Sequence, residues 1–415
     1  MLADFSERGL IHEVSAGLDE RVAKDPAIAA YIGFDPSADS LHVGHLMGVL
    51  ALRRLQLSGG RPIALVGGGT GMIGDPSGRS AERNLLDRAT LDANRGAIGA
   101  QLARLLDFSG ASGALLLDNL EWLGGLGMID FLRDTGKHLT VSYMLAKDSV
   151  KSRLEGGLSF TEFSYMLLQA NDFRHLAEHH DCEMQMGGSD QWGNITAGID
   201  LIRKKLGRSA FGLTWPLVTR ADGTKFGKTA DGAIWLDARR TSPYQFRQYF
   251  VQIADADIEK MLLQFSLHPI EVIKEIVAEQ KRSPEARIGQ RSLARELTAL
   301  VHGQEAAEAA EEAAAVLFGA NPMSATPATL HLIASEVAVT QMGVAALGDA
   351  VAVLVETKLA SSNSEARRLL TQRSVRANGE QVDDQTNLSQ IALLHNRWML
   401  LRKGKTSYHL VDVKG

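Results

Sequence analysis

The stretch from Ala30 to Leu57, AYIGFDPSADSLHVGHLMGVLALRRLQL, decides the fold class. Its first five residues, up to Phe34, form a short apolar run, which predicts a buried strand. Small and polar residues follow, and from Leu46 onward the apolar residues recur with the spacing of a helix. A buried strand that leads into a helix is the repeating unit of a parallel sheet covered by helices.

The same alternation continues through the first half of the chain. Further buried strands are predicted at 61–67, 114–117 and 183–187, and a further helix at 191–205. Strands that alternate with helices imply an α/β fold with a parallel sheet. Such sheets bind ligands at the carboxyl ends of their strands, so we expect the site there.

The second half of the chain has a different organisation. Residues 217–237 are rich in Gly, Thr and charge and predict a mobile loop, whereas the pattern from Ser242 to about Leu317 is helical. Two prolines and several small residues at 321–328 predict a linker. A compact module follows from about Val351, with a helix at 364–371 capped by Ser364 and a hairpin turn at Asn378–Gly379.

Composition limits the class of protein. The chain has 415 residues, 45% of them hydrophobic and 22% charged, which is ordinary for a soluble globular protein of two or three domains. No run of 18 apolar residues occurs, and the first residues do not resemble a signal peptide. Cys182 is the single cysteine, so no disulfide can form within the chain. These features predict a cytoplasmic protein.

Charge is distributed unevenly along the sequence. The net charge is −5, but residues 351–415 contain ten Lys or Arg and six Asp or Glu. An acidic body with a basic end is compatible with an RNA-binding appendage. From charge alone, an unevenly charged surface without a nucleic-acid partner is an equally good interpretation.

Two glycine-rich stretches resemble phosphate-binding motifs without satisfying them. Gly69–Gly74 matches the dinucleotide fingerprint, but the residues that follow it, DPSG, break the helix that the motif requires. The stretch from Gly223 to Thr229 has three residues between its first two glycines, where a P-loop has four. An oxidoreductase with a nicotinamide cofactor and a P-loop nucleotidase are therefore both disfavoured.

Two groups of polar residues are better candidates for a site. His42 and His45 flank Gly44 at a predicted helix start, where imidazoles can hydrogen-bond phosphate or ribose oxygens. Structural or metal-binding histidines are the alternative, but no His, Cys or Asp cluster at zinc spacing accompanies them. Tyr165, Gln169 and Asp172 lie at helical spacing on one face and can line a pocket, or form a partly exposed polar stripe.

Three motifs together resemble one family. Residues 31–45 resemble the first signature of class I aminoacyl-tRNA synthetases, the HIGH motif, in the form found in tyrosyl enzymes. The stretch KFGKT at 225–229 resembles the second signature, KMSKS, and GGSDQWGNI at 187–195 closely resembles the tyrosyl family. The module around 361–383 looks like a small RNA-binding domain shared with a ribosomal small-subunit protein. The whole chain is thus similar to bacterial tyrosyl-tRNA synthetases.

This resemblance implies a domain organisation. We expect a Rossmann-like catalytic domain at 1–215, with an insertion at about 119–160 that forms a homodimer and in which Phe160 is a contact. A mobile lysine loop and connector would occupy 216–245, and a helical tRNA-binding domain 246–320. A linker at 321–350 would then lead to an α+β RNA-binding domain at 351–415.

The resemblance also implies the reaction. The carboxylate of L-tyrosine attacks the α-phosphate of ATP, and the tyrosyl group then passes to the 3′ end of tRNA(Tyr). A carboxylate is already ionised at neutral pH, so the first step needs alignment and stabilisation of phosphate charge rather than a general base. Magnesium is expected to accompany ATP, without a dedicated protein metal site.

Site residues carry over by position. Pyrophosphate would meet Ser37, His42, Lys225, Lys228 and Thr229. The nucleotide would lie against Gly33, His45, Gly188 and Asp190, with Asp35 facing the activated substrate. Amino-acid contacts would come from Asp75, Tyr165 and Gln169 at the amino group, Gln191 at the carboxylate, and Tyr31 and Asp172 at the phenol. Transfer RNA would contact Arg79, Arg83, Lys147, Arg203, Lys204, Arg367 and Arg368.

Two positions depart from the family pattern. Ile32 stands where a cysteine is often found, and Gly48 where a hydroxyl residue often lies. We therefore expect fewer side-chain contacts to the ribose. Two other interpretations remain: a tryptophanyl enzyme of the same class, which the tyrosyl motifs disfavour, and a noncatalytic RNA-binding protein, which the two intact signatures disfavour.

Overall fold

The computed structural model describes residues 1–77, 86–154, 156–224, 226–229 and 232–414. The chain packs as two units. Unit 1 contains Met1–Asp237 and Ile253–Gly289, and unit 2 contains Ala238–Gln252 and Gln290–Gly415.

Unit 1 is built on a six-stranded sheet in the order β1-β6-β5-β2-β3-β4. Strands β6 to β4 are mutually parallel, and the short edge strand β1 pairs with β6 in the antiparallel sense. The α/β class and the predicted strands are confirmed, whereas β1 and β6 were not predicted. The strand bounds are β1 Glu13–Val14, β2 Ala29–Phe34, β3 Arg61–Val66, β4 Leu115–Asp118, β5 Cys182–Gly188 and β6 Phe211–Trp215.

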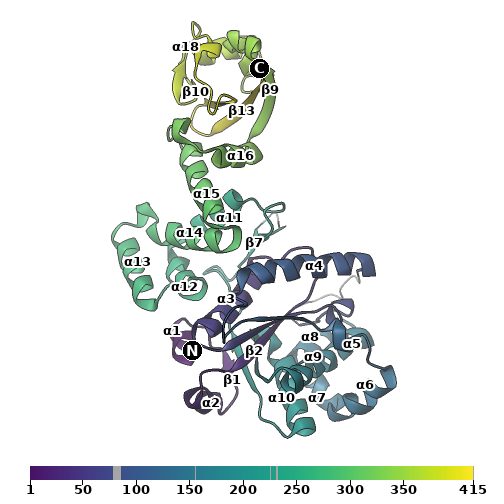
Figure 1. Ribbon diagram of the computed structural model, residues 1–415. Coiled ribbons are helices and arrows are strands. Elements are labelled where there is room, and N and C mark those ends of the chain that lie inside the picture. The colour runs from purple at the N-terminus through teal and green to yellow at the C-terminus, as the bar shows by residue number, and fades with distance from the viewer. Residues whose placement is uncertain (78–85, 155, 225, 230–231, 415) are drawn as a thin grey trace. The chain divides into compact units, whose positions relative to one another are not determined.

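Helices cover both faces of this sheet (Figure 1). Helices α3 and α4 lie on one face and α9 and α10 on the other, which buries the strands on both sides and explains their apolar runs. The four are α3 Val43–Leu57, α4 Arg88–Leu105, α9 Phe160–His179 and α10 Trp192–Leu206. The remaining elements of unit 1 are α1 Leu2–Glu7, α2 Leu18–Lys24, η1 Thr70–Met72, α5 Leu120–Leu123, α6 Met128–Asp134, η2 Gly136–His138, α7 Val141–Leu145, α8 Asp148–Leu154, η3 Ser189–Gln191, β7 Lys228–Thr229, β8 Gly232–Ala233, α12 Asp255–Phe265, α13 Ile270–Arg282 and η4 Pro284–Ala286.

The sheet opens between β2 and β5. The chain runs from β2 to β3 and β4 on one side and returns to β5 on the other, so the strand order reverses at this point. The paired register of β2 and β5 ends at Tyr31 and Gln185, although both strands continue beyond these residues. The strands thus separate toward their carboxyl ends, which is where open α/β sheets bind ligands.

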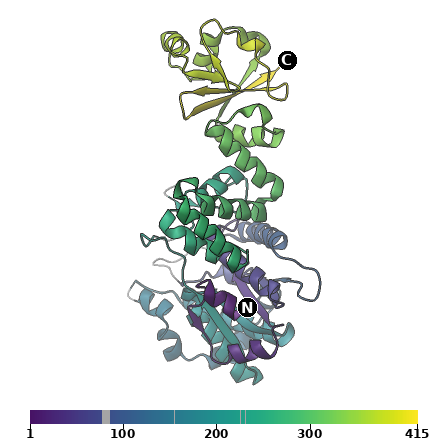
Figure 2. The ribbon, with the colours of Figure 1, turned by 90° about the vertical axis from the view of Figure 1, so that its left-hand side faces the viewer.

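Unit 2 combines helices with a five-stranded sheet in the order β11-β10-β12-β13-β9 (Figure 2). Its strands are β9 Ala338–Gly343, β10 Val375–Ala377, β11 Glu380–Val382, β12 Trp398–Lys403 and β13 Ser407–Lys414. Its helical elements are α11 Pro243–Val251, α14 Ile288–His302, α15 Gln304–Leu317, η5 Pro322–Ser324, α16 Pro327–Glu336, η6 Val344–Gly348, α17 Ala350–Glu356, α18 Asn363–Thr371 and η7 Leu388–Gln390. Among the described residues, no helix is both long and apolar enough to cross a bilayer.

The prediction of a linker at 321–350 is wrong. This segment contains α16 and β9, and β9 pairs in parallel with β13. Pro322 and Pro327, which suggested a linker, occupy the first turns of η5 and α16, where a missing N–H is harmless. A single apolar cluster joins these helices to the sheet; it includes Ala313, Val316, Leu330, Ile333, Trp398, Leu400 and Leu410.

The C-terminal module follows the prediction in outline. Asn378–Gly379 forms the turn between β10 and β11, as expected. Helix α18 is capped by Ser362, whose side chain accepts from the Glu365 amide, and not by Ser364. The stretch contains three serines, Ser361, Ser362 and Ser364, and the sequence alone did not distinguish them. Ser362 is the cap because its side chain accepts from the backbone amide three residues later.

Asn378 supports the turn in two ways. It is buried at a φ of +48°, its amide nitrogen donates to the Ala392 carbonyl at 2.8 Å, and its amide oxygen accepts from the Leu400 N–H at 2.7 Å. Asn378→Ala should therefore destabilise unit 2 by about 2–4 kcal/mol, through two lost hydrogen bonds and an unfavourable φ. Asn378→Gly keeps the favourable φ and should lose less. Hydrogen exchange of the β10 and β12 amides measures both; equal losses would contradict the contribution of φ.

Candidate active site

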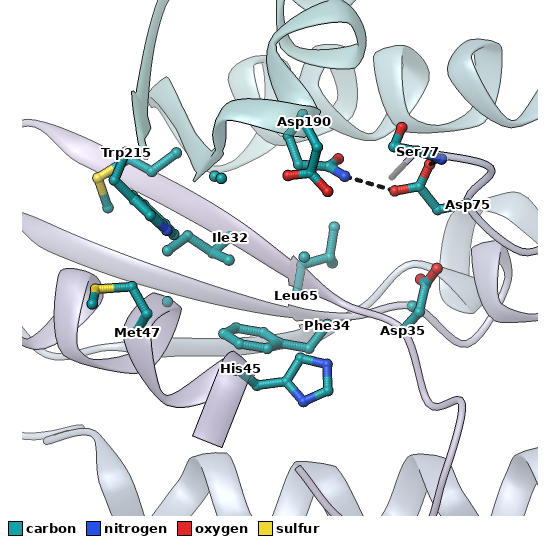
Figure 3. Close-up of a pocket in the computed structure, with 18 of the residues that line it drawn as sticks. Ile32, Phe34, Asp35, His45, Met47, Leu65, Asp75, Ser77, Asp190 and Trp215 are labelled. Atoms are coloured by element: carbon teal, nitrogen blue, oxygen red, sulfur yellow. Dashed lines mark hydrogen bonds between the residues drawn. The ribbon is translucent and has the colours of Figure 1, made fainter. Parts of the chain in front are cut away.

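The separated ends of β2 and β5 border a cavity of about 760 Å³. Its walls bring together candidates from four stretches of unit 1, and Figure 3 shows Asp35, Asp75 and Asp190 around it. The predicted site residues that line it are Tyr31, Gly33, Asp35, Ser37, His42, His45, Asp75, Tyr165, Gln169, Asp172, Gly188, Asp190 and Gln191.

An acid and a phenol lie in the buried part of the cavity. Asp172 is 2% exposed and Tyr31 is 1% exposed. The Tyr31 hydroxyl has no hydrogen-bond partner among the described residues, although such a group is costly to bury alone. The Tyr31 ring packs against Phe173, the residue after Asp172, at 5.4 Å between centroids. This part of the cavity therefore offers a hydroxyl and a carboxyl group to a ligand.

Two donors hold the Asp172 carboxylate. Asn119 Nδ2 donates to Oδ2 at 2.8 Å, and Trp122 Nε1 donates to Oδ1 at 2.7 Å. Burial raises the pKa of Asp172 to about 8, and the two hydrogen bonds oppose that shift. The Trp122 ring stacks on His175 at 4.2 Å, one turn along α9 from Asp172. The carboxylate is thus fixed in position while each oxygen retains capacity to accept from a ligand.

A hydrogen-bonded chain links Asp172 to Asp35. Asn119 Nδ2 also donates to Thr70 Oγ1 at 2.9 Å, and Thr70 Oγ1 donates to Asp35 Oδ1 at 2.8 Å. The Tyr165 hydroxyl donates to Asp35 Oδ2 at 3.0 Å. A Cβ on Gly67 would lie 2.1 Å from Asp35 Oδ1, so the chain requires glycine there.

A second polar chain forms the opposite wall. Gln191 Nε2 donates to Asp75 Oδ2 at 2.7 Å, the dashed line that ends at Asp75 in Figure 3. Gln169 Nε2 donates to Gln191 Oε1 at 3.3 Å. Asn194 Nδ2 donates to Gln169 Oε1 at 3.1 Å. Asp75 also accepts from the Ser77 amide at 2.9 Å. This wall presents a carboxylate and amide groups, which suit the ammonium and carboxylate of an amino acid.

The two histidines start α3 as predicted. His42 is the N-cap residue, and its Nδ1 accepts from the Gly44 amide at 3.0 Å. His45 Nδ1 accepts from the His42 amide at 3.2 Å, and the two rings stack at 3.9 Å. Because both Nδ1 atoms accept, each neutral ring carries its proton on Nε2. Both rings line the cavity, so they supply N–H donors at a helix amino end, where anions are favoured.

The predicted lysine loop meets the start of α3. Phe226 and Gly227 line the cavity, and the Ile234 amide donates to the Gly227 carbonyl at 3.2 Å. A Cβ on Gly227 would lie 3.2 Å from the Gly44 amide nitrogen. Lys228 and Thr229 form β7, which pairs with β8, while Lys225 lies outside the described residues.

The two departures from the family pattern lie side by side. A Cβ on Gly48 would be 3.5 Å from Ile32 Cγ2, in ordinary van der Waals contact. Ile32 is 6% exposed, and both residues line the cavity. The branched Ile32 side chain therefore covers the surface that Gly48 leaves bare, and this wall is apolar.

Two family models match the chain. One is described as "tRNA synthetases class I (W and Y)" and matches residues 23–319. The other is described as "Tyrosine--tRNA ligase SYY-like C-terminal domain" and matches residues 333–411.

Relatives named tyrosine–tRNA ligase match along almost the whole chain. A tyrosine–tRNA ligase of Roseiflexus castenholzii is 50% identical, with 99% of each chain covered. This chain belongs to the class I tyrosine–tRNA ligase family. Tyrosine–tRNA ligase 1 of Bacillus subtilis is 46% identical over 100% of this chain and 99% of the relative. A truncated mitochondrial tyrosyl-tRNA synthetase of Aspergillus nidulans has a TM-score of 0.69 and 32% identity, covering 76% of this chain and 93% of that structure.

The structure shows what the first of the two glycine-rich stretches, Gly69–Gly74, does. Thr70–Met72 is a short 3₁₀ turn, and Gly74 lies at a φ of +87° rather than at the start of an α-helix. The stretch therefore lacks the helix amino end that a dinucleotide site needs. Instead, it supplies Thr70 to the chain between Asp172 and Asp35.

Several residues in or beside the cavity were missed by sequence reasoning. Thr70 and Asn119 line the cavity, and Trp122 supports Asp172 from outside its lining. All three act through other residues and lie in loops or short turns, so no periodic pattern marks them. Gln185 is 2% exposed, lines the cavity, and its Oε1 has no hydrogen-bond partner among the described residues. Its position in register with Tyr31 could have been found only from the pairing of β2 with β5.

Five of the predicted tRNA-contact residues are described, and none of these five lines this cavity. Lys147 donates to Thr196 Oγ1 at 2.9 Å, and its ammonium lies 4.0 Å from the Tyr143 ring centroid. Arg203 and Lys204 both form ion pairs with Asp200, at 2.5 and 2.6 Å. Arg367 and Arg368 are exposed on α18 in unit 2, and Arg79 and Arg83 lie outside the described residues. In the described part of the chain, no group of three His, Cys, Asp or Glu side chains is arranged to hold a metal ion.

The raised pKa of Asp172 makes stability depend on pH. An unfolded aspartate titrates near pH 4, whereas burial raises the native pKa to about 8. As pH rises from about 4 to 8, the unfolded chain has already lost this proton, so the native state loses stability.

The Asn side chain of Asp172→Asn does not titrate. We therefore expect the stability of this variant, relative to that of the parent protein, to increase across this pH range. The unfolding temperature of the variant minus that of the parent should become more positive from pH 5 to 8, as measured by scanning calorimetry. The exposed Asp19→Asn is the control. A gap that stays constant with pH would rule out a raised pKa at this position.

Proposed function

We propose that this chain activates L-tyrosine with ATP and transfers the tyrosyl group to the 3′ end of tRNA(Tyr). The observation that carries the proposal is the buried pair of Tyr31 and Asp172, each with unused hydrogen-bonding capacity. A phenol hydroxyl between them donates to the carboxylate and accepts from the Tyr31 hydroxyl. Phenylalanine would leave both groups unpaired, and tyrosyl-tRNA synthetases are the standard example of the discrimination, about 10⁵, that such unpairing produces.

The rest of the amino acid fits the polar chains above this pair. Asp75, Tyr165 and Gln169 would bind the ammonium group, and Gln191 would lie beside the carboxylate. The bonds of Gln191 to Asp75 and of Tyr165 to Asp35 support this assignment, because they fix the side chains before the substrate enters. The carboxylate then attacks the α-phosphate, and pyrophosphate leaves with the bonding electrons.

The nucleotide would lie over the start of α3. The Nε2–H groups of His42 and His45 face phosphate and ribose oxygens, with Ser37 beside the pyrophosphate and Asp190 at the ribose. Gly33 leaves the backbone open to the nucleotide, since a Cβ there would meet no atom within 4 Å. Gly188 makes room for Asp190 instead, because a Cβ there would lie 2.7 Å from Asp190 Oδ1. Lys225, Lys228 and Thr229 would neutralise the leaving pyrophosphate. Magnesium would enter bound to ATP.

We also infer a homodimer formed through the insertion at 119–160. Its surface carries exposed apolar side chains on α6, α7 and the start of α9. Large exposed apolar patches are uncommon in monomers, so these side chains indicate an interface. They include Met128 at 72%, Ile129 at 69%, Val141 at 62% and Phe160 at 74% exposure. A second copy of the chain would cover them. A cytoplasmic location completes the proposal, supported by Cys182, a buried free thiol.

The specificity pair can be tested by exchange kinetics. Asp172→Ala should lower kcat/KM for tyrosine in ATP–pyrophosphate exchange by at least about 100-fold, and should change the KM for ATP by less than about 3-fold in either direction. Tyr31→Phe should keep the fold, because its hydroxyl has no partner among the described residues, and should reduce the preference for tyrosine over phenylalanine by about 10-fold. If Asp172→Ala weakened the use of tyrosine and of ATP equally, or if tryptophan drove the exchange, the assignment would be wrong.

The dimer can be tested with one charge. Ile129→Asp places a carboxylate in the exposed apolar cluster and should convert the dimer to monomer at low micromolar concentration, as measured by sedimentation equilibrium. Leu57→Asp, on α3 and 65% exposed, is the matched control and should remain dimeric. If the parent chain sediments as a monomer, this part of the proposal fails while the activity remains to be judged by exchange.

A further inference from the structure

A second cavity, of about 450 Å³, lies within unit 2. It is bordered by the end of α15 and η5 on one side and by strands β10, β12 and β13 on the other. Its described lining contains two arginines, a tyrosine and no carboxylate: Val316, Gly319, Ala320, Asn321, Pro322, Arg376, Gly379, Leu400, Arg402 and Tyr408. The volume falls within the range of about 300–1,000 Å³ typical of small-ligand sites.

The two arginines are direct cross-strand neighbours. Arg376 on β10 pairs in register with Arg402 on β12, and Arg402 pairs with Tyr408 on β13. Like charges directly opposite each other destabilise a sheet. No carboxylate of the described lining offsets the repulsion. The arrangement therefore costs stability in the free protein and calls for an anion.

Both guanidinium groups are held in place yet keep donors available. Arg402 Nε donates to the Gly404 carbonyl at 2.9 Å, and Arg376 Nη1 donates to the Gly379 carbonyl at 2.8 Å. Among the described residues, Arg402 Nη1 and Nη2 have no hydrogen-bond partner. A Cβ on Gly319 would lie 2.8 Å from Arg402 Nη1, so glycine at this position makes room for the guanidinium.

An aromatic face adjoins these donors. Arg402 Cζ lies 5.5 Å from the centroid of the Tyr408 ring. The Tyr408 hydroxyl donates to the Val316 carbonyl at 3.1 Å, which fixes the ring against the end of α15. Phe318, beside the lining residue Gly319, is 78% exposed. Guanidinium donors for a phosphate beside planar groups for a base are the combination that proteins use to bind single-stranded nucleic acid.

We propose that this cavity binds one unstacked nucleotide of an RNA strand, with its phosphate on Arg376 and Arg402 and its base against Tyr408. The proposal rests on the proposed function for the identity of the RNA, a tRNA, and adds a site to it. The basic excess of residues 351–415 supports an RNA ligand.

Equilibrium binding of the full-length chain to a tRNA(Tyr) transcript tests the phosphate contact. Arg402→Gln should weaken binding by about 10-fold and reduce the slope of log Kd against log salt by about 1. Lys405→Gln removes the same charge from the neighbouring turn, outside the cavity lining, and is the matched control. Equal effects of the two variants would overturn the proposal.

A stability measurement separates binding from folding. Since Arg376 and Arg402 repel each other, Arg376→Gln should not lower the unfolding temperature of the free protein, although it weakens RNA binding. A fall in unfolding temperature that parallels the loss of RNA affinity would show a merely structural role and overturn the proposal. Tyr408→Phe should bind as the parent does, whereas Tyr408→Leu should lose at least about 5-fold.

Two further measurements identify the ligand and control for loss of catalytic activity. AMP and inorganic phosphate, tested as competitors, should displace the transcript only weakly; tight binding of either one alone would assign the cavity to a small anion and overturn the RNA proposal. Tyrosine-dependent ATP–pyrophosphate exchange should be unchanged in all these variants, because the catalytic cavity is lined by unit 1. Absence of exchange in the parent would defeat the proposed function, whereas loss of the RNA effects alone would defeat this inference.

Discussion

The site depends on one buried carboxylate held by two neutral donors. Asp172 lies on α9 against the apolar interior, where ionisation is unfavourable, and Asn119 and Trp122 from the β4–α5 region oppose that penalty without supplying a charge. A cationic partner would satisfy the acid completely and leave nothing for a substrate. Neutral donors instead fix the position of the carboxylate and keep it available as an acceptor.

This constraint extends through the cavity because its polar residues are connected in series. Asn119 binds both Asp172 and Thr70, and Thr70 binds Asp35, which also accepts from Tyr165. The buried end that would receive the side chain and the wall that would face the reacting carboxylate are thus parts of one network. A substrate that misplaces Asp172 also disturbs the groups around the activated bond, so selection and alignment are coupled.

The sequence predicted those polar residues of this cavity that lie on regular elements or in recognisable motifs. The helical spacing of Tyr165, Gln169 and Asp172 placed them on one face of α9, and the two histidines marked the start of α3. The supporting residues escaped prediction because the sequence does not reveal their partners. Asn119 is defined by hydrogen bonds between distant segments, and Gln185 by the register of two strands. The supposed linker failed for a related reason: proline favours both loops and the first turn of helices, and only packing against the sheet distinguishes them.

The apolar cluster shared by α15, α16 and the small sheet has a consequence for how this chain can be divided. A cut near residue 320, where composition changes, divides this cluster: Ala313 and Val316 would be exposed on one fragment, and Trp398, Leu400 and Leu410 on the other. The chain also passes between the two units three times, near 237, 252 and 289. Truncation at the apparent sequence boundary would therefore expose apolar side chains on both fragments, whereas a boundary placed before α15 keeps the buried members of this cluster together.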